Sequence, residues 1–110
     1  MNVWFVSDLH VGHRKVAATR GYGYPDSDSP VGISAHDDWL ASMWDVVKPD
    51  DHVWILGDTS AGGSAAQRNA LQWISERPGR KHLISGNHDG CHPMHRDSHK
   101  WQAIYLETFD

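Results

Sequence analysis

Side chains that bind metal ions or transfer protons occur in three short groups along the chain. The groups comprise Asp8, His10, Asp58, Asn87, His88 and Asp89. Carboxylate and amide oxygens, together with imidazole nitrogens, suit a borderline or hard divalent ion such as Mn, Fe, Co, Ni or Zn. Cys91 is the only cysteine, so the chain offers no thiolate set for a structural zinc site and no internal disulfide. These residue types point to metal-assisted chemistry.

The spacing within each group fits shared metal ions. Asp8 and His10 stand at alternate positions of a short extended turn, so both can reach one ion. The carboxylate of Asp58 can bridge two ions, and Asn87 offers a neutral carbonyl oxygen to the second. A glycine precedes Asp58 and another precedes Asn87, which lets the backbone approach closely. Each group alone is a weak signal, and its weight comes from the three occurring together.

Each group directly follows a short apolar run. The runs are residues 2–6, 52–56 and 81–85, and they are rich in β-branched or aromatic residues and too short for helices. We therefore predict three strands. Because their apolarity is continuous, we expect both faces of these strands to be covered, as in a parallel sheet.

Helical patterns separate the strands. Ser34 is the predicted N-cap of the first helix, with Asp37 in an imperfect capping box, and Pro49 ends it. Ser64 begins a second helix, which stops at residues 78–79. The last helical pattern carries Trp101, Ile104, Tyr105 and Phe109.

The order of elements predicts an α/β fold with a mostly parallel sheet, flanking helices and right-handed crossovers. Glycines, prolines and aspartates in residues 20–33 predict a long surface loop before the first of these helices. We expect residues 1–110 to form a single domain. In open α/β sheets, ligands bind just beyond the carboxyl ends of the strands, so the three groups should meet at one edge.

Composition excludes several functional classes. The 110 residues carry a formal net charge of -4, and no basic stretch is long enough to bind nucleic acid through phosphate contacts alone. The apolar run Val3 to Val6 is too short for a signal peptide or membrane span, so we expect a cytoplasmic protein that does not bind membranes. Of the nine histidines, we interpret His36, His52 and His82 as surface scatter.

The three groups match, in order, the first three motifs of the calcineurin-like metallophosphoesterases. The matching residues are Asp8-x-His10, Gly57-Asp58 and Gly86-Asn87-His88-Asp89. The longer stretch from Trp4 to His13 resembles the small phosphoesterases of bacteria and their phages, as does the segment Lys48 to Asp58. The resemblance implies the N-terminal part of the α/β sandwich of that family.

The resemblance also implies a mechanism. Two divalent ions about 3.5–4 Å apart would activate a hydroxide that hydrolyses a phosphoester, with phosphodiesters as the first expectation. Manganese is the expected metal, and Fe, Ni, Co or Zn are alternatives. Asp58 would bridge the ions, Asp8 and His10 would hold one, and Asn87 would hold the other.

Further roles follow from the same resemblance. His88 would stabilise the transition state or protonate the leaving oxygen, and Asp89 would orient His88 through a hydrogen bond. His13 would contact the substrate at the mouth of the site. Arg14 is a second substrate-binding candidate that could face a phosphate, or it could be a solvated charge on a helix.

The substrate could be a nucleotide. Tyr22 and Tyr24 in the long loop are candidates for stacking on a nucleobase. The alternative, which we favour, is that they pack the loop onto its own domain.

Complete family members carry two later histidine motifs and a second set of strands, and we find neither here. The resemblance therefore implies a truncated chain with weakened metal affinity. His92, His95 and His99 could form a substitute site, although we favour a loop beside the active-site mouth followed by a solvated helix. The alternative functions are a catalytically impaired remnant that binds a protein or nucleotide, and a homo-oligomer in which a second chain completes the site or pairs with the sheet edge.

Overall fold

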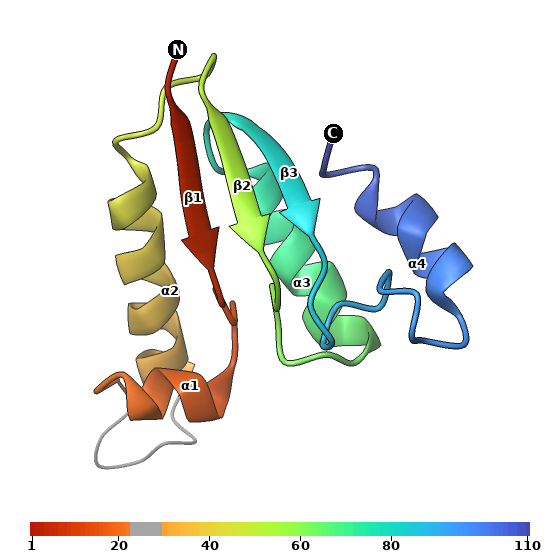
Figure 1. The fold of residues 1–110 in the computed structure, drawn as a ribbon. Coiled ribbons are helices and arrows are strands. Elements are labelled where there is room, and N and C mark those ends of the chain that lie inside the picture. Colours follow the sequence, from red (N-terminus) through yellow and green to blue (C-terminus); the bar gives the residue numbers. More distant parts are fainter. Residues whose placement is uncertain (23–29) are drawn as a thin grey trace.

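Each strand is followed by one or two helices in the computed structural model, which describes residues 1–22 and 30–110 (Figure 1). In chain order the elements are β1 (Val3–Ser7), α1 (Arg14–Thr19), α2 (Pro30–Trp44), β2 (His52–Leu56), α3 (Ser64–Ser75), β3 (Arg80–Ile84) and α4 (Ser98–Tyr105). The predicted α/β class is confirmed, and each predicted strand lies within one residue of an observed one.

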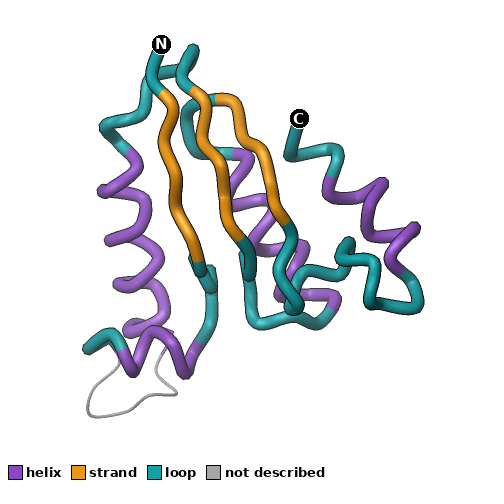
Figure 2. Tube along the Cα trace, in the orientation of Figure 1, coloured by secondary structure: helices purple, strands orange, loops and turns teal. Residues whose placement is uncertain are grey.

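The three strands form one parallel sheet in the order β1-β2-β3. Val53 of β2 pairs with Trp4 on one side and with Lys81 on the other. Because all three strands run the same way, the loops that follow them leave from the same end of the sheet, the lower end in Figure 2. This arrangement brings the three groups of polar residues to one edge.

The core lies between the sheet and the longer helices. Val53 and Ile55 of β2 are buried on the face against which these helices pack, and Figure 1 shows α3 behind β2 and β3. The buried core consists of Leu9, Val11, Leu40, Trp44, Val47, Val53, Ile55, Ala70, Leu71, Ile74, Trp101, Tyr105 and Phe109. Leu9 and Val11 belong to the loop after β1, so part of the core lies beneath the first group of polar residues.

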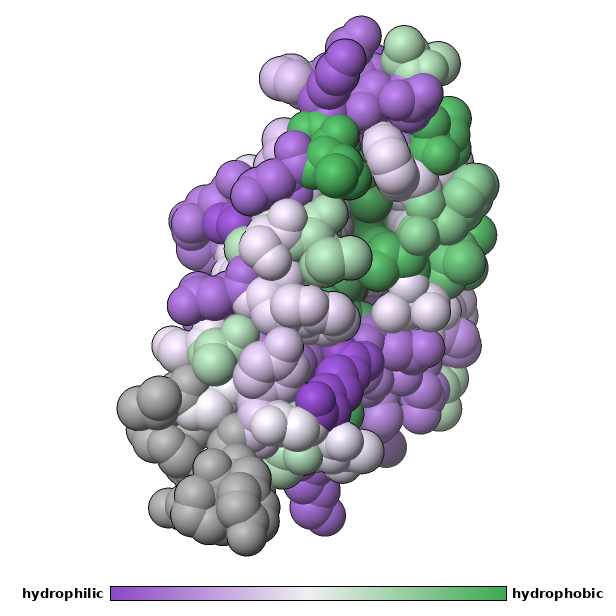
Figure 3. Space-filling view, turned by 90° about the vertical axis from the view of Figure 1, so that its left-hand side faces the viewer, coloured by the Kyte–Doolittle hydropathy of each residue, from purple (hydrophilic) through white to green (hydrophobic). Residues whose placement is uncertain are grey.

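The opposite face of the sheet is open within the described part of the chain, so the prediction that both faces are covered is wrong here. Phe5 is 68% exposed, and Val3, Leu56 and Ile84 are exposed as well. Figure 3, viewed from the α2 side, shows apolar surface at the upper right, where the open face lies. The apolarity of the strands is continuous, but the described helices pack on one face only.

Asp51 joins the amino ends of β1 and β2. Its carboxylate accepts hydrogen bonds from the backbone N–H groups of Asn2 (2.7 Å) and Lys48 (3.0 Å) and from the indole N–H of Trp4 (3.0 Å). The bond from Lys48, followed by those from Asn2 and Trp4, lowers the pKa of Asp51 to about 2. Asp51 thereby fixes where β1 starts relative to β2.

Helix boundaries differ from the predictions at several points. α2 begins at Pro30 rather than Ser34, because proline is well suited to the first turn of a helix. Asp37 therefore lies inside α2, and the predicted capping box is wrong. α3 starts at Ser64 as predicted, although Gly63 is its N-cap. The loop predicted over residues 20–33 lies partly outside the described residues.

Two smaller differences from the predictions concern α1 and the segment after α4. The short helix α1, which sequence patterns did not predict, follows β1 and is capped by His13. Phe109 is buried but lies beyond the end of α4. Within residues 1–22 and 30–110, none of the helices combines the length and apolarity that crossing a membrane requires.

Candidate metal centre

The loops after β1 and β2 continue to pair beyond the ends of the strands. The backbone N–H groups of Asp8, His10 and Val11 donate to the carbonyls of Gly57 (3.3 Å), Asp58 (3.1 Å) and Thr59 (2.8 Å). This backbone ladder holds the two loops against each other. It places Asp8 and His10 beside Asp58.

The same residues have an unusual backbone conformation. Asp8, His10 and Asp58 have φ values of 53°, 49° and 47°, and no other non-glycine residue in the described part of the chain has a positive φ. Such left-handed conformations are uncommon outside glycine, although aspartate and histidine adopt them more readily than most residues. Each costs roughly 1–3 kcal/mol and persists only where surrounding contacts impose it, commonly at functional sites. The conformational strain is thus concentrated on the candidate ligands.

The three side chains converge on one point. One ligand atom from each of Asp8, His10 and Asp58 lies within 4.8 Å of the other two, and His10 Nε2 is 3.9 Å from Oδ1 of Asp8. The side chains of His10 and Asp58 are 13% and 15% exposed, whereas that of Asp8 is 58% exposed. The cluster is therefore anchored in the protein and open on one side.

His10 is suited to bind a metal ion. Its Nδ1 atom is buried and has no hydrogen-bond partner among the described residues. Burial lowers the pKa of His10, although Asp58 and Asp8 oppose this effect. A neutral imidazole keeps the lone pair that a metal ion needs, and two carboxylates complete the donor set. The residues present thus fit a divalent ion.

The third loop contacts Asp58 directly. The backbone N–H of His88 donates to Oδ1 of Asp58 (3.0 Å), and His88 Nδ1 lies 3.3 Å from Oδ2. A Cβ atom on Gly86 would lie 2.8 Å from the backbone nitrogen of Asp58 and would also meet its carboxylate, so only glycine fits there. Asn87, which lies between Gly86 and His88 in the sequence, is exposed. His95 Nε2 donates a hydrogen bond to the backbone carbonyl of Asn87 (2.7 Å).

Asp89 has a different position from the predicted one. The family resemblance implied a hydrogen bond between His88 and this carboxylate, but the hydrogen-bond partners of Asp89 are other residues. Its two oxygens accept from the backbone N–H groups of Asp58, Thr59 and Gly86 and from the Thr59 hydroxyl, at 2.8–3.0 Å. Asp89 is fully buried. It ties the loop after β3 to the loop after β2, and its charge is compensated by four donors.

Two helices support the third loop from below. The Gln67 side-chain oxygen on α3 accepts hydrogen bonds from the backbone N–H of Gly90 (2.8 Å) and from the Tyr105 hydroxyl on α4 (2.7 Å). A Cβ atom on Gly90 would clash with Gln67 and with Trp101. These buried hydrogen bonds of Gln67 are absent from the sequence predictions. A glutamine in one amphipathic helix and a tyrosine in another give no indication that they contact each other.

The two predicted substrate-binding residues lie at the start of α1. His13 Nδ1 accepts from the backbone N–H of Val16 (3.3 Å), which caps the helix, and its ring lies edge-on to that of His10 at 5.1 Å. Burial, followed by the nearby His10 and His88, lowers the pKa of His13. Arg14 is exposed as the first residue of α1.

The aromatic residues of the long loop are placed only in part. Tyr22 packs edge-on against the ring of His36 at 5.8 Å and lies 6.2 Å from the Trp39 ring. Its contacts are therefore those of a residue that packs the loop onto its own domain. Tyr24 lies outside the described residues.

The remaining histidines correct several interpretations. His36 is 0% exposed, so its assignment to surface scatter is wrong. His52 and His82 are half-buried and stack on each other at 5.1 Å on the open face of the sheet. Of the late histidines, only His99 lies in a helix, whereas His92 and His95 belong to the preceding loop. In the described residues the one potential metal cluster is that of Asp8, His10 and Asp58, and it includes none of these histidines.

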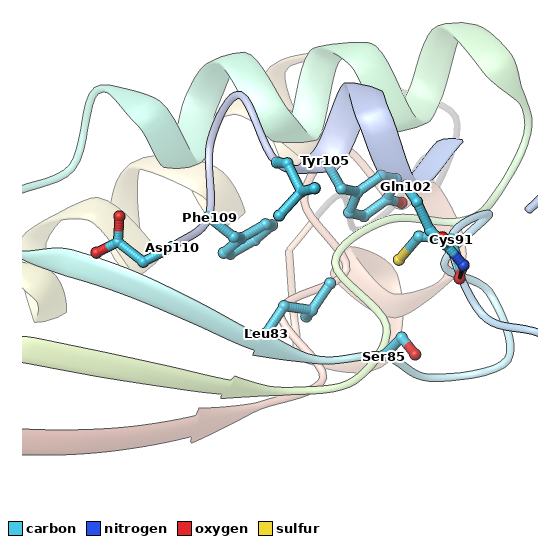
Figure 4. A pocket seen from close by; sticks show the side chains of 8 residues that line it. Leu83, Ser85, Cys91, Gln102, Tyr105, Phe109 and Asp110 are labelled. Carbon is cyan, nitrogen blue, oxygen red and sulfur yellow. Dashed lines mark hydrogen bonds between the residues drawn. The ribbon is translucent and has the colours of Figure 1, made fainter. Parts of the chain in front are cut away.

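Two hollows flank the third loop. A cleft of about 330 Å³ has Asn87 and His88 on one wall, with Gly62, His95 and Lys100 elsewhere in its lining. A second hollow of about 230 Å³ lies between β3 and α4 and includes Leu83, Ser85, Cys91, Gln102, Tyr105 and Phe109 in its lining (Figure 4). Burial raises the pKa of the Cys91 thiol to about 11, which disfavours the thiolate form that binds metals. Only the first hollow shares residues with the predicted site.

Comparisons with known proteins bear on the whole chain. A family model for calcineurin-like phosphoesterases matches residues 1–110. Two curated relatives, both named Gene 66 protein, come from Mycobacterium phage L5 and Mycobacterium phage D29, and each is 51% identical over 99% of this chain. The matches cover 50% and 51% of these relatives, so the chain spans about half the length of the curated relatives it matches.

A solved structure has a similar fold. The protein of unknown function AQ665 from Aquifex aeolicus matches with a TM-score of 0.63 at 23% identity. The match covers 100% of this chain and 50% of that protein. At this identity the likeness concerns the fold alone.

Proposed function

The chain belongs to the calcineurin-like phosphoesterase family, and from this membership and the geometry of its strand-end loops we propose that it takes part in metal-dependent hydrolysis of phosphodiesters. The observation that carries the proposal is the cluster of Asp8, His10 and Asp58. Their ligand atoms lie within 4.8 Å of one another, and all three residues have left-handed backbones. A site built only for stability has no need of acidic and imidazole side chains that face one another from strained backbone positions.

The proposed ligands divide between two metal positions. Asp8, His10 and Asp58 would hold one divalent ion, and Asp58 and Asn87 would hold the second; manganese is the first metal to test. When bound, such ions supply a nucleophile from water at neutral pH and neutralise charge on the phosphate. The protein contributes the fixed positions of its donors, which the ladder between residues 8–11 and 57–59 provides.

His88 is the proposed proton donor. Its Nδ1 lies 3.3 Å from Asp58, so that contact fixes the direction of the ring, while the side chain is 46% exposed and accessible to a substrate. In the proposed step His88 donates a proton to the leaving oxygen as the P–O bond breaks. Asp89 contributes indirectly, because it holds the backbone of Asp58 and Gly86 in place.

His13 is proposed to contact the phosphate. Its Nδ1 accepts the capping hydrogen bond from Val16, so the ring proton of the neutral form is on Nε2. Nε2–H is then available as a donor to a phosphate oxygen. Arg14, one residue further on, is proposed to add positive charge at the same edge.

The leaving group has a proposed location beside His88. The cleft of about 330 Å³ shares Asn87 and His88 with the site and has the Lys100 side chain in its lining. This volume can accept part of a nucleotide or another organic ester group. The proposed substrate class is therefore a phosphodiester, with the Lys100 ammonium in the cleft as a donor to its organic group.

Hydrolysis of bis(p-nitrophenyl) phosphate with added Mn²⁺ tests the proposal. The wild-type chain should release p-nitrophenol, and the Asp58→Ala variant should not. Asp38→Ala, which removes an exposed carboxylate on α2, is the matched control and should keep the wild-type rate. Equal rates from the wild-type and Asp58→Ala proteins would mean that the activity comes from a contaminant. Calorimetric titration with Mn²⁺ separates loss of metal binding from loss of chemistry.

A further inference from the structure

Arg20, just after α1, reaches back to the loop that carries two of the candidate ligands. Its Nη2 donates to the backbone carbonyl of Asp8 (2.7 Å), and its Nη1 donates to the carbonyl of Leu9 (3.4 Å). Both carbonyls belong to the segment in which Asp8 and His10 have left-handed backbones. The guanidinium therefore contacts the first half of the strained segment.

The same guanidinium contacts a buried histidine. Arg20 Nη1 lies 2.8 Å from Nε2 of His36, which is fully buried. Because a guanidinium can only donate, Nε2 of His36 is the acceptor and the ring proton is on Nδ1. That nitrogen lies 3.0 Å from Oδ1 of Asp37 and donates to it. The contacts on both sides thus assign one neutral tautomer to His36.

Asp37 returns the chain of contacts to the ligand loop. Both of its carboxylate oxygens lie 3.1 Å from the backbone nitrogen of Gly12, which donates to them. Gly12 has a φ of 70° and follows His10 by two residues. The contacts therefore begin at the carbonyl of Asp8, pass through Arg20, His36 and Asp37, and end at the N–H of Gly12. His10 thus lies between two backbone groups that are held by hydrogen bonds, the carbonyl of Asp8 and the N–H of Gly12.

We infer that Arg20, His36 and Asp37 are positioning residues that hold residues 8–12 in the strained conformation in which Asp8 and His10 can share one divalent ion. The inference rests on the proposed function, because it concerns the metal ligands of that site. None of the three belongs to the cluster of Asp8, His10 and Asp58. Arg20 and Asp37 bond the backbone of the loop, and His36 links these two side chains. They raise metal affinity by removing the freedom that the loop would otherwise lose on binding.

A purely structural alternative is that these contacts only attach α1 and α2 to the sheet. In that case removing them would lower stability throughout the fold and leave the affinity of the folded protein for metal unchanged. The positioning role makes a different prediction, namely a local loosening of residues 8–12 with a loss of metal affinity. Metal titration and amide exchange distinguish the two.

The test uses Arg20→Ala and Asp37→Ala, with Lys15→Ala and Asp38→Ala as controls. Both control residues are exposed. Lys15 lies on α1, which Arg20 directly follows, and Asp38 is the neighbour of Asp37 on α2. Calorimetric titration with MnCl₂ should give a 10- to 100-fold weaker affinity for the two test variants, the range typical of outer partners of metal ligands. The controls should bind like the wild-type chain. Hydrogen exchange should accelerate at the Gly12 amide and stay unchanged at Val53 and Ile55 in the sheet.

Two milder substitutions test the same inference by the same measurements. Arg20→Lys keeps the positive charge but loses the paired N–H donors of the guanidinium, and Asp37→Asn keeps one acceptor oxygen. Both variants should therefore bind Mn²⁺ with intermediate affinity. If either alanine variant is unfolded at the assay temperature, this milder pair decides on the same readouts.

Two results overturn the inference. One is Mn²⁺ affinity within about twofold of wild type in the folded variants, where the positioning role predicts a loss of about 10- to 100-fold for the alanine variants and a smaller but clear loss for the milder pair. The other is exchange that accelerates as much in β2 as at Gly12. A wild-type chain that binds no Mn²⁺ would instead overturn the proposed function itself, and the titration of the wild-type protein distinguishes these cases.

Discussion

The backbone N–H of His88 donates a 3.0 Å hydrogen bond to Oδ1 of Asp58, and Nδ1 of the same histidine lies 3.3 Å from Oδ2. A residue proposed to protonate the leaving group therefore also fixes the carboxylate proposed to bridge the metal ions. The loop after β3 and the loop after β2 are joined through this pair. A shift of one loop would therefore break these contacts with the other, which links the proposed metal ligand to the proposed proton donor.

Replacing Asp58 by asparagine should abolish tight metal binding. The side chain keeps its size, but it loses its charge, and one oxygen becomes an NH₂ group that faces the donors of His88. Because Asp58 is a proposed ligand, the loss of Mn²⁺ affinity should exceed the roughly 100-fold upper range seen for outer partners. Calorimetric titration measures it, and Asp45→Asn, at an exposed position just after α2, is the control. Unchanged affinity would rule out Asp58 as a ligand.

His88→Ala should separate chemistry from stability. The side chain is 46% exposed and pairs with Asp58, so its removal should change the free energy of unfolding by no more than about 1 kcal/mol. The loss of a positioned proton donor should lower kcat by roughly 10²- to 10⁴-fold. Thermal melting and steady-state kinetics measure the two effects. A variant with wild-type kcat would remove His88 from the mechanism.

Asp89→Asn should mainly lower stability, in contrast to His88→Ala, which should mainly lower kcat. The carboxylate is fully buried and accepts hydrogen bonds from four donors, and an NH₂ group would face some of these donors. Leaving buried donors unpaired should lower the free energy of unfolding by about 1–3 kcal/mol. Urea denaturation of the metal-free protein measures this loss. If Asp89→Asn is as stable as the wild-type chain, the structural role assigned to Asp89 is wrong.

The sequence could predict the fold and the meeting of the three loops because both depend on local signals. Short runs such as His52–Leu56 are too brief for helices, and parallel strands bring their carboxyl ends together. Asp8, His10 and Asp58 could be singled out because their residue types suit a metal ion. The start of α2 was less predictable, because the predicted cap at Ser34 competes with Pro30 at the true start.

The roles of partner residues could not be predicted, since they depend on contacts between distant segments. Nothing around His36 indicates that it will be buried between Arg20 and Asp37. Likewise, the family resemblance implied that Asp89 orients its neighbour His88, whereas the turn after β3 directs the Asp89 carboxylate toward Thr59. The prediction that both faces of the sheet are covered was wrong for a related reason. The composition of a strand does not reveal which elements cover each of its faces.

Gly86→Ala should disrupt the contact between the second and third loops. The backbone of Gly86 is not in the left-handed region, so the cost comes from the added methyl group, which would lie 2.8 Å from the Asp58 nitrogen. Overpacking of this kind costs about 1–3 kcal/mol and should weaken Mn²⁺ binding through displacement of Asp58. Gly63→Ala is the matched control, because Gly63 has a φ of 80° and nothing within 4 Å, so only backbone strain is added.

Thermal melting and Mn²⁺ titration of both glycine variants check this prediction. Gly63→Ala should lose stability through strain alone and keep its Mn²⁺ affinity. Equal affinity in Gly86→Ala and Gly63→Ala would show that the close approach of Gly86 to Asp58 has no bearing on the metal site.

Asp51 should contribute a pH-dependent part of the stability. Hydrogen bonds from Lys48, Asn2 and Trp4 lower its pKa in the folded chain to about 2, compared with 3.8 for an ordinary aspartate. The folded state therefore binds this proton less readily than the unfolded state does. The resulting stabilisation is fully present above about pH 4 and is lost as the pH falls toward about 2. Asp51→Asn should remove this component and lower the Tm by several degrees near neutral pH.

Melting curves recorded from neutral pH down to about pH 2 check the sign of this linkage. The difference in Tm between the wild-type chain and Asp51→Asn should shrink as the pH falls through the window between the two pKa values. Asp50→Asn, at the exposed neighbouring position, should follow the wild-type curve. A difference that stays constant over the whole range would mean that the loss comes from altered packing of the side chain. In that case the charge of Asp51 is not what joins β1 to β2.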